Sequence, residues 1–241
     1  MSCPSLWINL DCVDLDKTRV YLERSKSSPI DLSLHSDRKY LSNHFFKFLP
    51  RIAGRLKSLD IKGGPRHLRV ISTYLHCPAP LLEELRIHGD NDPVLPSTFL
   101  NGDLSPLHKL RLEDVCTELP WRNMANLTSF TLVHGSPISA SQYLDFFESA
   151  PHLRSVCLYS TTPITGIQNG RLVPLACLKS MDCGGRLESH LFNHLLIPIG
   201  ARLKIYPLRL RAAHPSLSTT SRISPTSPRS SCTMRNHRCG S

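Results

Sequence analysis

The sequence predicts an α/β solenoid in which short parallel strands alternate with helical or irregular segments on the convex side. Six segments share the pattern apolar-x-x-apolar-x-apolar, and they begin at Leu56, Leu82, Leu107, Leu127, Leu153 and Leu178. They recur at intervals of 26, 25, 20, 26 and 25 residues, and fixed periods in this range are typical of stacked repeats. The chain also contains 38 leucines but only 16 aromatic residues. That bias favours many similar packing layers over one aromatic-centred core.

Each repeated segment has the alternation of a short strand with one buried face. In the first segment, Leu59 and Ile61 are separated by one polar residue, and the other five segments repeat this spacing. Side chains alternate across a strand, so positions one, four and six are expected to point into the core. The alternating residues 30–34 (IDLSL) predict a further strand before Leu56. Parallel strands of this kind require right-handed crossovers between them.

The segments between the strands differ in their helical signals. Ser139 and Gln142 form a Ser-x-x-Gln capping box, and an apolar stripe that includes Tyr143 and Phe146 follows it. We therefore expect a helix there, ended by Pro151. Residues 44–54 and 67–76 predict two more helices. Between residues 92 and 106 the prolines and a glycine favour a loop or short 3₁₀ turns.

The basic charge is confined to the C-terminal part of the chain. The formal net charge is +10, from 29 basic and 19 acidic residues. Residues 201–241 hold eight Lys or Arg and no acid, so residues 1–200 hold 21 basic and 19 acidic residues, a net of +2. A nearly neutral repeat region speaks against a nucleic-acid binder, and the tail predicts at most weak, salt-sensitive association with nucleic acid. The tail is rich in Ser, Pro and Arg, a composition that predicts disorder. Its two candidate origins are an authentic basic tail and a shifted reading frame.

The sequence offers no catalytic or cofactor motif. The twelve histidines never form His-Glu-x-x-His, and His190-x-x-x-His194 lacks a nearby third ligand. No Gly-x-Ser-x-Gly elbow or phosphate-binding glycine fingerprint occurs, and the nine cysteines include no Cys-x-x-Cys pair. We therefore expect a protein that is not an enzyme and that takes no cofactor and no metal. The sequence shows no signal peptide and no long apolar run, which predicts a cytoplasmic or nuclear protein without a membrane partner. We also expect the protein to be a monomer.

Several segments resemble one repeat family. They are Pro4-Ser5-Leu6-Trp7, residues 14–23 (DLDKTRVYLE), residues 28–34 (SPIDLSL) and residues 78–87 (PAPLLEELRI). The pattern resembles leucine-rich-repeat proteins, and more narrowly the F-box-associated leucine-rich-repeat proteins of mushroom-group fungi. The resemblance implies the substrate-recognition region of a ubiquitin-ligase receptor. It divides the chain into a remnant of the F-box end with a connecting helix (1–29), a leucine-rich-repeat solenoid (30–203) and a disordered basic tail (204–241).

The chain departs from this family in two respects. Only residues 4–7 match the F-box, so we expect no docking to the adaptor subunit of the ligase. A protein acting as a stand-alone binding module, or as a truncated gene product with no ligase role, is the alternative. The asparagine that often follows the third apolar position is also missing, because other residues occupy those sites: Gly64, Asp90, Val115, Gly135 and Thr161. With the F-box helices missing, we expect a poorly capped N-terminal end, with Trp7 covering Leu10 and Ile30.

The outward positions of the strands predict a binding face for an unknown protein ligand. The fifth positions form one column: Asp60, Arg86, Arg111, Thr131, Cys157 and Asp182. Five flanking residues are Glu84, His88, Lys109, Glu113 and Tyr159. The candidate site comprises Asp60, Glu84, Arg86, Lys109, Arg111 and Tyr159. Because Arg and Tyr anchor interfaces more often than other residues do, Arg86, Arg111 and Tyr159 are the predicted anchors. A merely solvated face is the alternative.

Overall fold

The computed structural model of this chain describes residues 3–11, 15–35, 46–90, 93–117, 123–135, 138–160, 170–185 and 189–206. The chain divides into two units, residues 1–208 and 209–241, and all described residues lie in the first. Residues 207–241, which include most of the predicted tail, lie outside the described residues.

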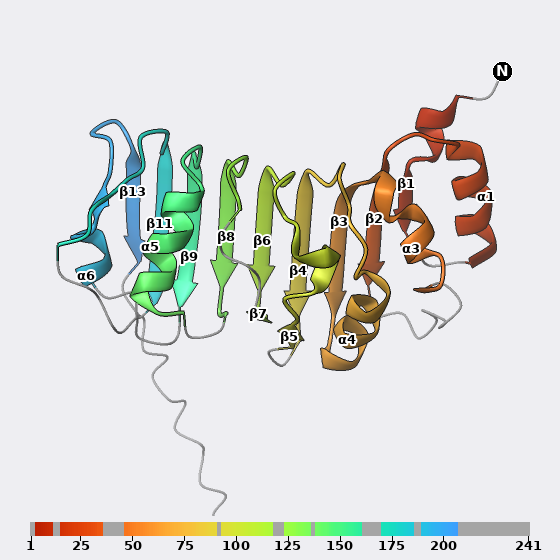
Figure 1. Ribbon diagram of the computed structural model, residues 1–241, viewed down its shortest axis with the longest axis horizontal. Helices are drawn as coiled ribbons and strands as arrows, with labels where there is room; N and C mark the ends of the chain where they lie inside the picture. Colours follow the sequence, from red (N-terminus) through yellow and green to blue (C-terminus); the bar gives the residue numbers. More distant parts are fainter. Residues whose placement is uncertain are drawn as a thin grey trace, which may run out of the picture. The chain divides into compact units, whose positions relative to one another are not determined.

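The described part is a mixed α/β structure built on one nine-stranded parallel sheet (Figure 1). All neighbouring strands in this sheet run parallel. The strands, in their order across the sheet, are β1 (Asn9–Asp11), β2 (Ile30–His35), β3 (Leu56–Gly63), β4 (Glu84–Gly89), β6 (Lys109–Glu113), β8 (Ser129–Val133), β9 (Ser155–Ser160), β11 (Ser180–Gly185) and β13 (Arg202–Tyr206). The six predicted strand segments and the predicted strand at residues 30–34 are confirmed, and so is their parallel pairing.

The connecting segments between these strands contain short helices and two small ladders. The helices are η1 (Pro4–Trp7), α1 (Leu15–Ser25), α3 (Leu49–Ile52), η2 (Ala53–Arg55), α4 (Pro65–Tyr74), η3 (Phe99–Gly102), α5 (Ala140–Ser149) and α6 (Ser189–Phe192). The ladders pair β5 (Val94–Leu95) with β7 (Cys116–Thr117), and β10 (Val173–Pro174) with β12 (Leu195–Leu196). Helices α4 and α5 lie on the same face of the large sheet (Figure 1).

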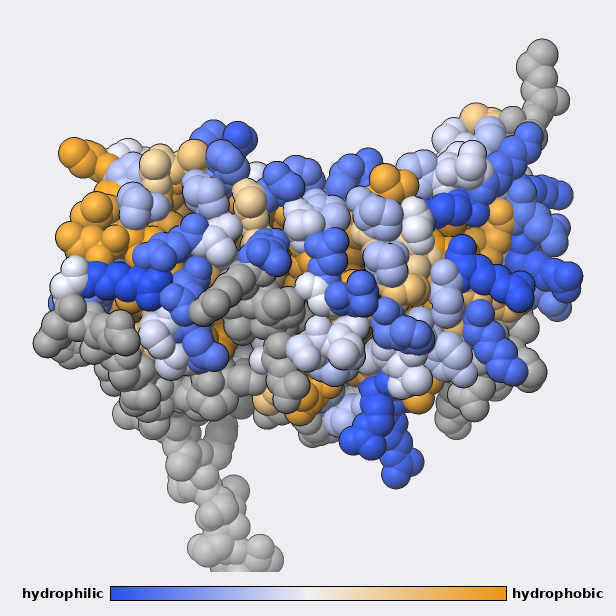
Figure 2. Space-filling view, viewed as in Figure 1, coloured by the Kyte–Doolittle hydropathy of each residue, from blue (hydrophilic) through white to orange (hydrophobic). Residues whose placement is uncertain are grey.

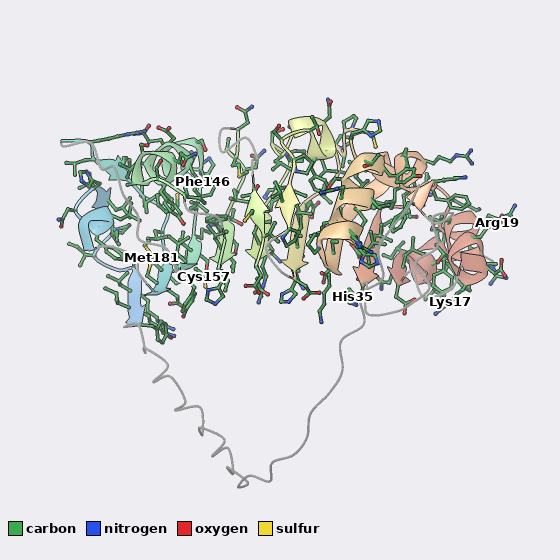
Figure 3. All side chains as sticks on the ribbon, turned by 90° about the horizontal axis from the view of Figure 1, so that it is seen from below. Lys17, Arg19, His35, Phe146, Cys157 and Met181 are labelled. Carbon is green, nitrogen blue, oxygen red and sulfur yellow. The ribbon has the colours of Figure 1, made fainter. Side chains whose placement is uncertain are left out.

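The core follows the repeated apolar pattern. In all six segments the first, fourth and sixth positions are buried, from Leu56, Leu59 and Ile61 in β3 to Cys183 in β11. The helices close this core from one side. Phe146 of α5 packs on Phe130 of β8 with ring centroids 4.4 Å apart. Figure 3 shows Phe146 on the helix side of the sheet, and Cys157 and His35 on the side away from the helices. Alternation along each strand therefore separates a core face from an outward face, as expected.

A tight turn precedes each repeated strand, and the sequence patterns considered above did not reveal it. The N–H of the first leucine of each segment donates to the carbonyl three residues earlier, for example Leu82 to Ala79 at 3.0 Å and Leu153 to Ala150 at 3.2 Å. The residue at this earlier position is buried in all six repeats: Ala53, Ala79, Leu104, Met124, Ala150 and Leu175. Each repeat thus contributes a fourth apolar residue to the core. Together with the turn hydrogen bond, this residue fixes the direction in which the chain enters the strand.

The helix predictions have mixed outcomes. The capping box at Ser139 is present: its Oγ accepts from the N–H of Gln142, and the Gln142 side chain accepts from the N–H of Ser139. Helix α4 covers most of the predicted 67–76 helix and begins at Pro65. Of the predicted helix at 44–54, residues 44 and 45 lie outside the described residues, and Phe46 is helical. The remainder holds the short α3, with Pro50 in its first turn, and the 3₁₀ turn η2.

The two ends of the sheet differ from the predicted boundaries. Strand β1 pairs with β2, so the sheet begins before residue 30, and β1 escaped prediction because its only apolar residue is Leu10. The boundary at residue 203 falls inside β13, and residues 204–206 therefore belong to the sheet. At the N-terminal end, which the sequence predicts to be poorly capped, Leu10 of β1 is buried and Leu6 of η1 is 71% exposed. No helix among the described residues is long and apolar enough to cross a membrane.

Trp7 contacts α1, and its predicted cover over Leu10 and Ile30 stays a prediction. Its ring meets Tyr21 of α1 edge-to-face at 5.0 Å, and the Arg24 guanidinium lies 4.5 Å from the Trp7 ring centroid. Trp7 therefore fastens η1 to α1.

Candidate protein-binding surface

The strand register aligns the outward residues in three rows across the sheet. The middle row runs Ser33, Asp60, Arg86, Arg111, Thr131, Cys157, Asp182 and Lys204. The predicted column is therefore present in the structure. Lys204 extends it at one end, and Ser33 and then Asp11 of β1 extend it at the other. Glu84 and Lys109 are neighbours in the row on one side, and His88 and Glu113 are neighbours in the row on the other. We call the outward residues of β3, β4 and β6 the charged patch: Asp60, Lys62, Glu84, Arg86, His88, Lys109, Arg111 and Glu113.

Arg86 and Arg111 occupy adjacent strands of the charged patch at the same register. Each is held by a carboxylate two residues away on its own strand, in opposite directions. The Arg86 Nε and Nη2 donate to Oε1 of Glu84 at 2.8 and 2.6 Å. The Arg111 Nε donates to Oε1 of Glu113 at 2.7 Å. The backbones of Arg86 and Arg111 are about 4.8 Å apart. Because each guanidinium is paired with its own carboxylate, the repulsion between the two positive charges is reduced.

Glu84 and Glu113 each also pair with a basic side chain on the neighbouring strand. Oε2 of Glu84 lies 3.9 Å from the Lys109 Nζ, and Oε2 of Glu113 lies 2.9 Å from the His88 Nδ1. The six groups therefore form two linked networks that join β4 to β6. The predicted residues Glu84, Arg86, Lys109 and Arg111 all belong to them, and Asp60 lies beside Arg86 in the register.

The acids of the patch lie deeper than the bases. The Glu84 and Glu113 side chains are 22% and 20% exposed, whereas Arg86 and Arg111 are 51% and 56% exposed. The guanidinium groups are therefore what an approaching molecule meets first. Because the carboxylates hold them in place, less side-chain entropy is lost when a partner binds.

The environment of Glu113 favours its ionised form. Partial burial alone would disfavour the charge, but hydrogen bonds from His88 and Arg111 and the positive charge of Arg111 hold the pKa of Glu113 below its ordinary value. The carboxylate is therefore charged at neutral pH.

A shallow hollow of about 220 Å³ opens over this patch. Its lining includes Asp60, Lys62, Arg86, Arg111 and Glu113. The size suits a side chain or a few atoms of a peptide, and it is smaller than the sites of about 300–1,000 Å³ that enclose drug-sized ligands.

Tyr159 belongs to a different part of the face. It lies on β9, two strands from Arg111, which is about 10 Å across the sheet. Its ring lies beside Gly184 of β11, where a Cβ would stand 2.5 Å from the ring, and 5.9 Å from the ring of Tyr206 on β13. The structure therefore groups Arg86 with Arg111 and places Tyr159 with Tyr206. The leucine repeat does not reveal this second aromatic residue, because the segment of β13 has Gly200 at the first position of the pattern.

Small, uncharged side chains separate these two groups. Ser129 of β8, Ser155 of β9 and Ser180 of β11 lie in one register row, and the Ser180 Oγ donates to the Ser155 Oγ at 3.2 Å. Thr131 and Cys157 continue this character in the middle row. The outward face is thus charged over β3, β4 and β6. Over β8 and β9 it carries small uncharged side chains in two register rows, and Val133 beside Tyr159 in the third.

The described residues offer little for covalent or metal chemistry. They contain no group of three or more His, Cys, Asp or Glu that could hold a metal ion. Burial raises the pKa of the Cys183 thiol to about 12, and burial together with the charge of Asp182 raises the pKa of the Cys157 thiol. Both thiols are protonated at neutral pH, and a protonated thiol is a poor nucleophile. His194 Nδ1 lies 2.7 Å from the carbonyl of Arg171, while the side chain of His190 lies outside the described residues.

A larger hollow of about 470 Å³ lies between α4 and the segment around β5. The Ser72 and Thr73 hydroxyls in its lining donate to carbonyls of their own helix at 2.6 and 2.9 Å. Prolines form much of the remaining wall. Arg69, His76 and Thr98 also line this hollow, and the His76 Nδ1 lies 2.6 Å from the carbonyl of Thr73.

Comparison with protein-family models, curated proteins and solved structures finds no match for this chain.

Proposed function

We propose that this chain is a non-catalytic protein-recognition module, a leucine-rich-repeat solenoid whose outward strand face binds another protein. The observation that carries the proposal is the side-by-side placement of Arg86 and Arg111, each exposed and each held by its own carboxylate. Arginine is over-represented among the residues that dominate interface energies. The regular burial of the repeated apolar positions supports the solenoid assignment.

The charged patch suits a protein partner better than a small molecule. Basic heads above deeper carboxylates present alternating charge, which favours specificity and a fixed binding register. The small side chains of β8 and β9 lie between this patch and the Tyr159–Tyr206 pair, so a partner could approach the strand backbones closely there. A bound segment that spans both groups must cover about 10 Å or more across the strands.

The resemblance to F-box-associated repeat proteins adds a more specific role to this proposal. In that role the face would recognise substrates of a ubiquitin ligase. The alternative is a stand-alone binding module, or a truncated gene product with no ligase role. The two assignments differ in whether the chain also retains the adaptor subunit of the ligase.

The test is selection of random peptides displayed on phage against the full chain. Affinities of the enriched peptides are then measured for the wild type and for the combined variant R86A/R111A/Y159A. We expect a loss of roughly 30-fold or more, as for removal of an interface hot spot. The control R51A/R66A removes two exposed arginines from the helix side of the sheet and should leave the affinities unchanged. Failure to enrich any peptide, or affinities that the triple substitution does not change, would overturn the proposal.

A further inference from the structure

The last layer of the sheet leaves its core positions uncovered. Leu203 and Ile205 of β13 pair in register with Met181 and Cys183 of β11, which are buried. Leu203 and Ile205 are 43% and 61% exposed instead. Figure 2 shows apolar surface gathered at this end of the molecule, where Figure 1 draws α6 and β13. Of the ten exposed large apolar side chains among the described residues, five lie here: Leu196, Ile199, Leu203, Ile205 and Tyr206.

Strand β13 also presents an unpaired backbone edge within the described sheet. The N–H of Arg202 donates to the carbonyl of Lys179, so the backbone groups of Arg202 point toward β11. By alternation those of Lys204 do the same, and those of Leu203 and Ile205 point toward the open edge. Apolar side chains and unpaired backbone groups thus belong to the same two residues. An edge of this kind is a template for pairing with another strand.

We propose that β13 pairs with β13 of a second copy of this chain, antiparallel and about a twofold axis at Lys204. In this register Leu203 faces Ile205 of the other copy, and the two outward backbone sets form the closely spaced hydrogen-bonded pairs of an antiparallel ladder. Leu203 and Ile205 then cover each other on the core side. A twofold interface needs a self-complementary patch, and this five-residue strand supplies one.

The opposite side of β13 fits the same register. Arg202 faces Tyr206 of the other copy, an arrangement that favours a cation–π contact. The two Lys204 side chains meet at the axis, and Asp182 lies beside each Lys204 in the register of β11 and β13. The four charges at the axis therefore sum to zero. A shift of the register by one residue would place Leu203 opposite Lys204 or Tyr206 of the other copy, so that it would no longer face Ile205.

The charge of the chain beyond β13 argues for a second copy over an intramolecular cover. Residues 207–241 contain six arginines and no acid. If residues 207–241 covered β13, their arginines would lie beside Arg202 and Lys204, and the repulsion between these positive charges would oppose the packing. Pro207 also follows β13 immediately and lacks the N–H that a continuing strand needs. In the dimer both outward faces lie on the same side of one continuous sheet. This proposal replaces the monomer expected from the sequence.

The first experiment measures the molar mass of the full chain by light scattering during gel filtration across the micromolar range. We expect twice the monomer mass of 27.1 kDa. The variant L203K/I205K should be monomeric, and it should still fold because both side chains are exposed in one copy. Leu81 is 47% exposed and lies before β4, so L81K is a matched control that should stay dimeric.

The second experiment tests the register. In this pairing the two residues 204 form a non-hydrogen-bonded pair with Cα atoms about 4.5 Å apart, within the range that a disulfide spans. K204C should form a covalent dimer under mild oxidation much faster than the wild type or K57C, an exposed position on β3. A monomeric wild type, a dimer that persists in L203K/I205K, or crosslinking of K204C no faster than of K57C would each overturn the proposal.

Discussion

Arg111 and His88 share one carboxylate: Arg111 bonds Oε1 of Glu113 and His88 lies 2.9 Å from Oε2. Because Arg111 and Glu113 lie on β6 and His88 lies on β4, this carboxylate joins two strands on their outward face. It also orients Arg111 beside Arg86. The geometry of the candidate site therefore depends on Glu113, whose own side chain is only 20% exposed.

We expect E113Q to lower the free energy of unfolding by about 1 kcal/mol at neutral pH, the typical worth of a hydrogen bond to a charged group in a partly exposed setting. The pKa of Glu113 is lowered in the folded state from a reference of 4.5, so its contribution is present above that reference and is lost as the pH falls through the folded pKa. Urea unfolding of wild type and E113Q should therefore differ at pH 7 and converge at low pH.

The control for this measurement is E23Q. Glu23 and Arg19 form an exposed pair on α1, with side chains 69% and 72% exposed, and such pairs contribute little. A gap between wild type and E113Q that stays constant down to low pH would contradict the role of the charge.

Arg55 fastens the end of α1 to the start of β3. Its Nε and Nη2 donate to the carbonyl of Ser28 at 3.1 and 2.9 Å, and Nη2 also donates to the Oγ of the buried Ser25 at 2.7 Å. We expect R55A to destabilise the fold by about 1–3 kcal/mol, because it leaves these acceptors unpaired. R51A, at an exposed position four residues earlier, should change the midpoint of urea unfolding very little. Equal midpoints for R55A and R51A would refute this role.

The chain as printed should not retain the adaptor subunit of a ubiquitin ligase. The residues that the resemblance assigns to the end of the F-box, Pro4–Trp7, form a single 3₁₀ turn that packs on α1. Four residues cannot bury the roughly 1,000 Å² expected of a specific interface. Co-purification of the adaptor with residues 1–241 at sub-micromolar affinity would contradict this expectation and favour the ligase assignment over the stand-alone module.

The periodic part of the fold could be predicted from the sequence because burial imposes the period directly. Leu59 and Ile61 and their equivalents must alternate if one face is buried, and the register of the outward column follows from the same alternation. The ends could not be predicted in this way. Strand β1 has one apolar residue, and the segment of β13 has Gly200 where the repeat has its first leucine, so neither stands out against the repeat.

The grouping of the candidate site was also only partly predictable. Register alone places Arg86 beside Arg111, and the structure agrees. The direction of a side chain above the sheet depends on its neighbours, and a glycine on the next strand leaves space that a sequence pattern does not reveal. Tyr159 therefore lies toward Gly184 and Tyr206, although its position in the repeat permitted either direction.

The contact between Tyr159 and Gly184 makes the effect of G184A depend on residue 159. Gly184 is not among the residues with positive φ, so alanine fits its backbone and should stabilise the chain by about 0.4–1 kcal/mol through the unfolded state. In the wild type, however, the added Cβ would stand 2.5 Å from the Tyr159 ring, which must move and give up its contact with Tyr206. An aromatic pair is worth about 0.5–1.5 kcal/mol, so G184A should be neutral to destabilising in the wild type and stabilising in Y159A. Urea unfolding of the four proteins in this double-mutant cycle measures the difference, and the same effect of G184A in both backgrounds would show that the Tyr159 ring does not lie over Gly184.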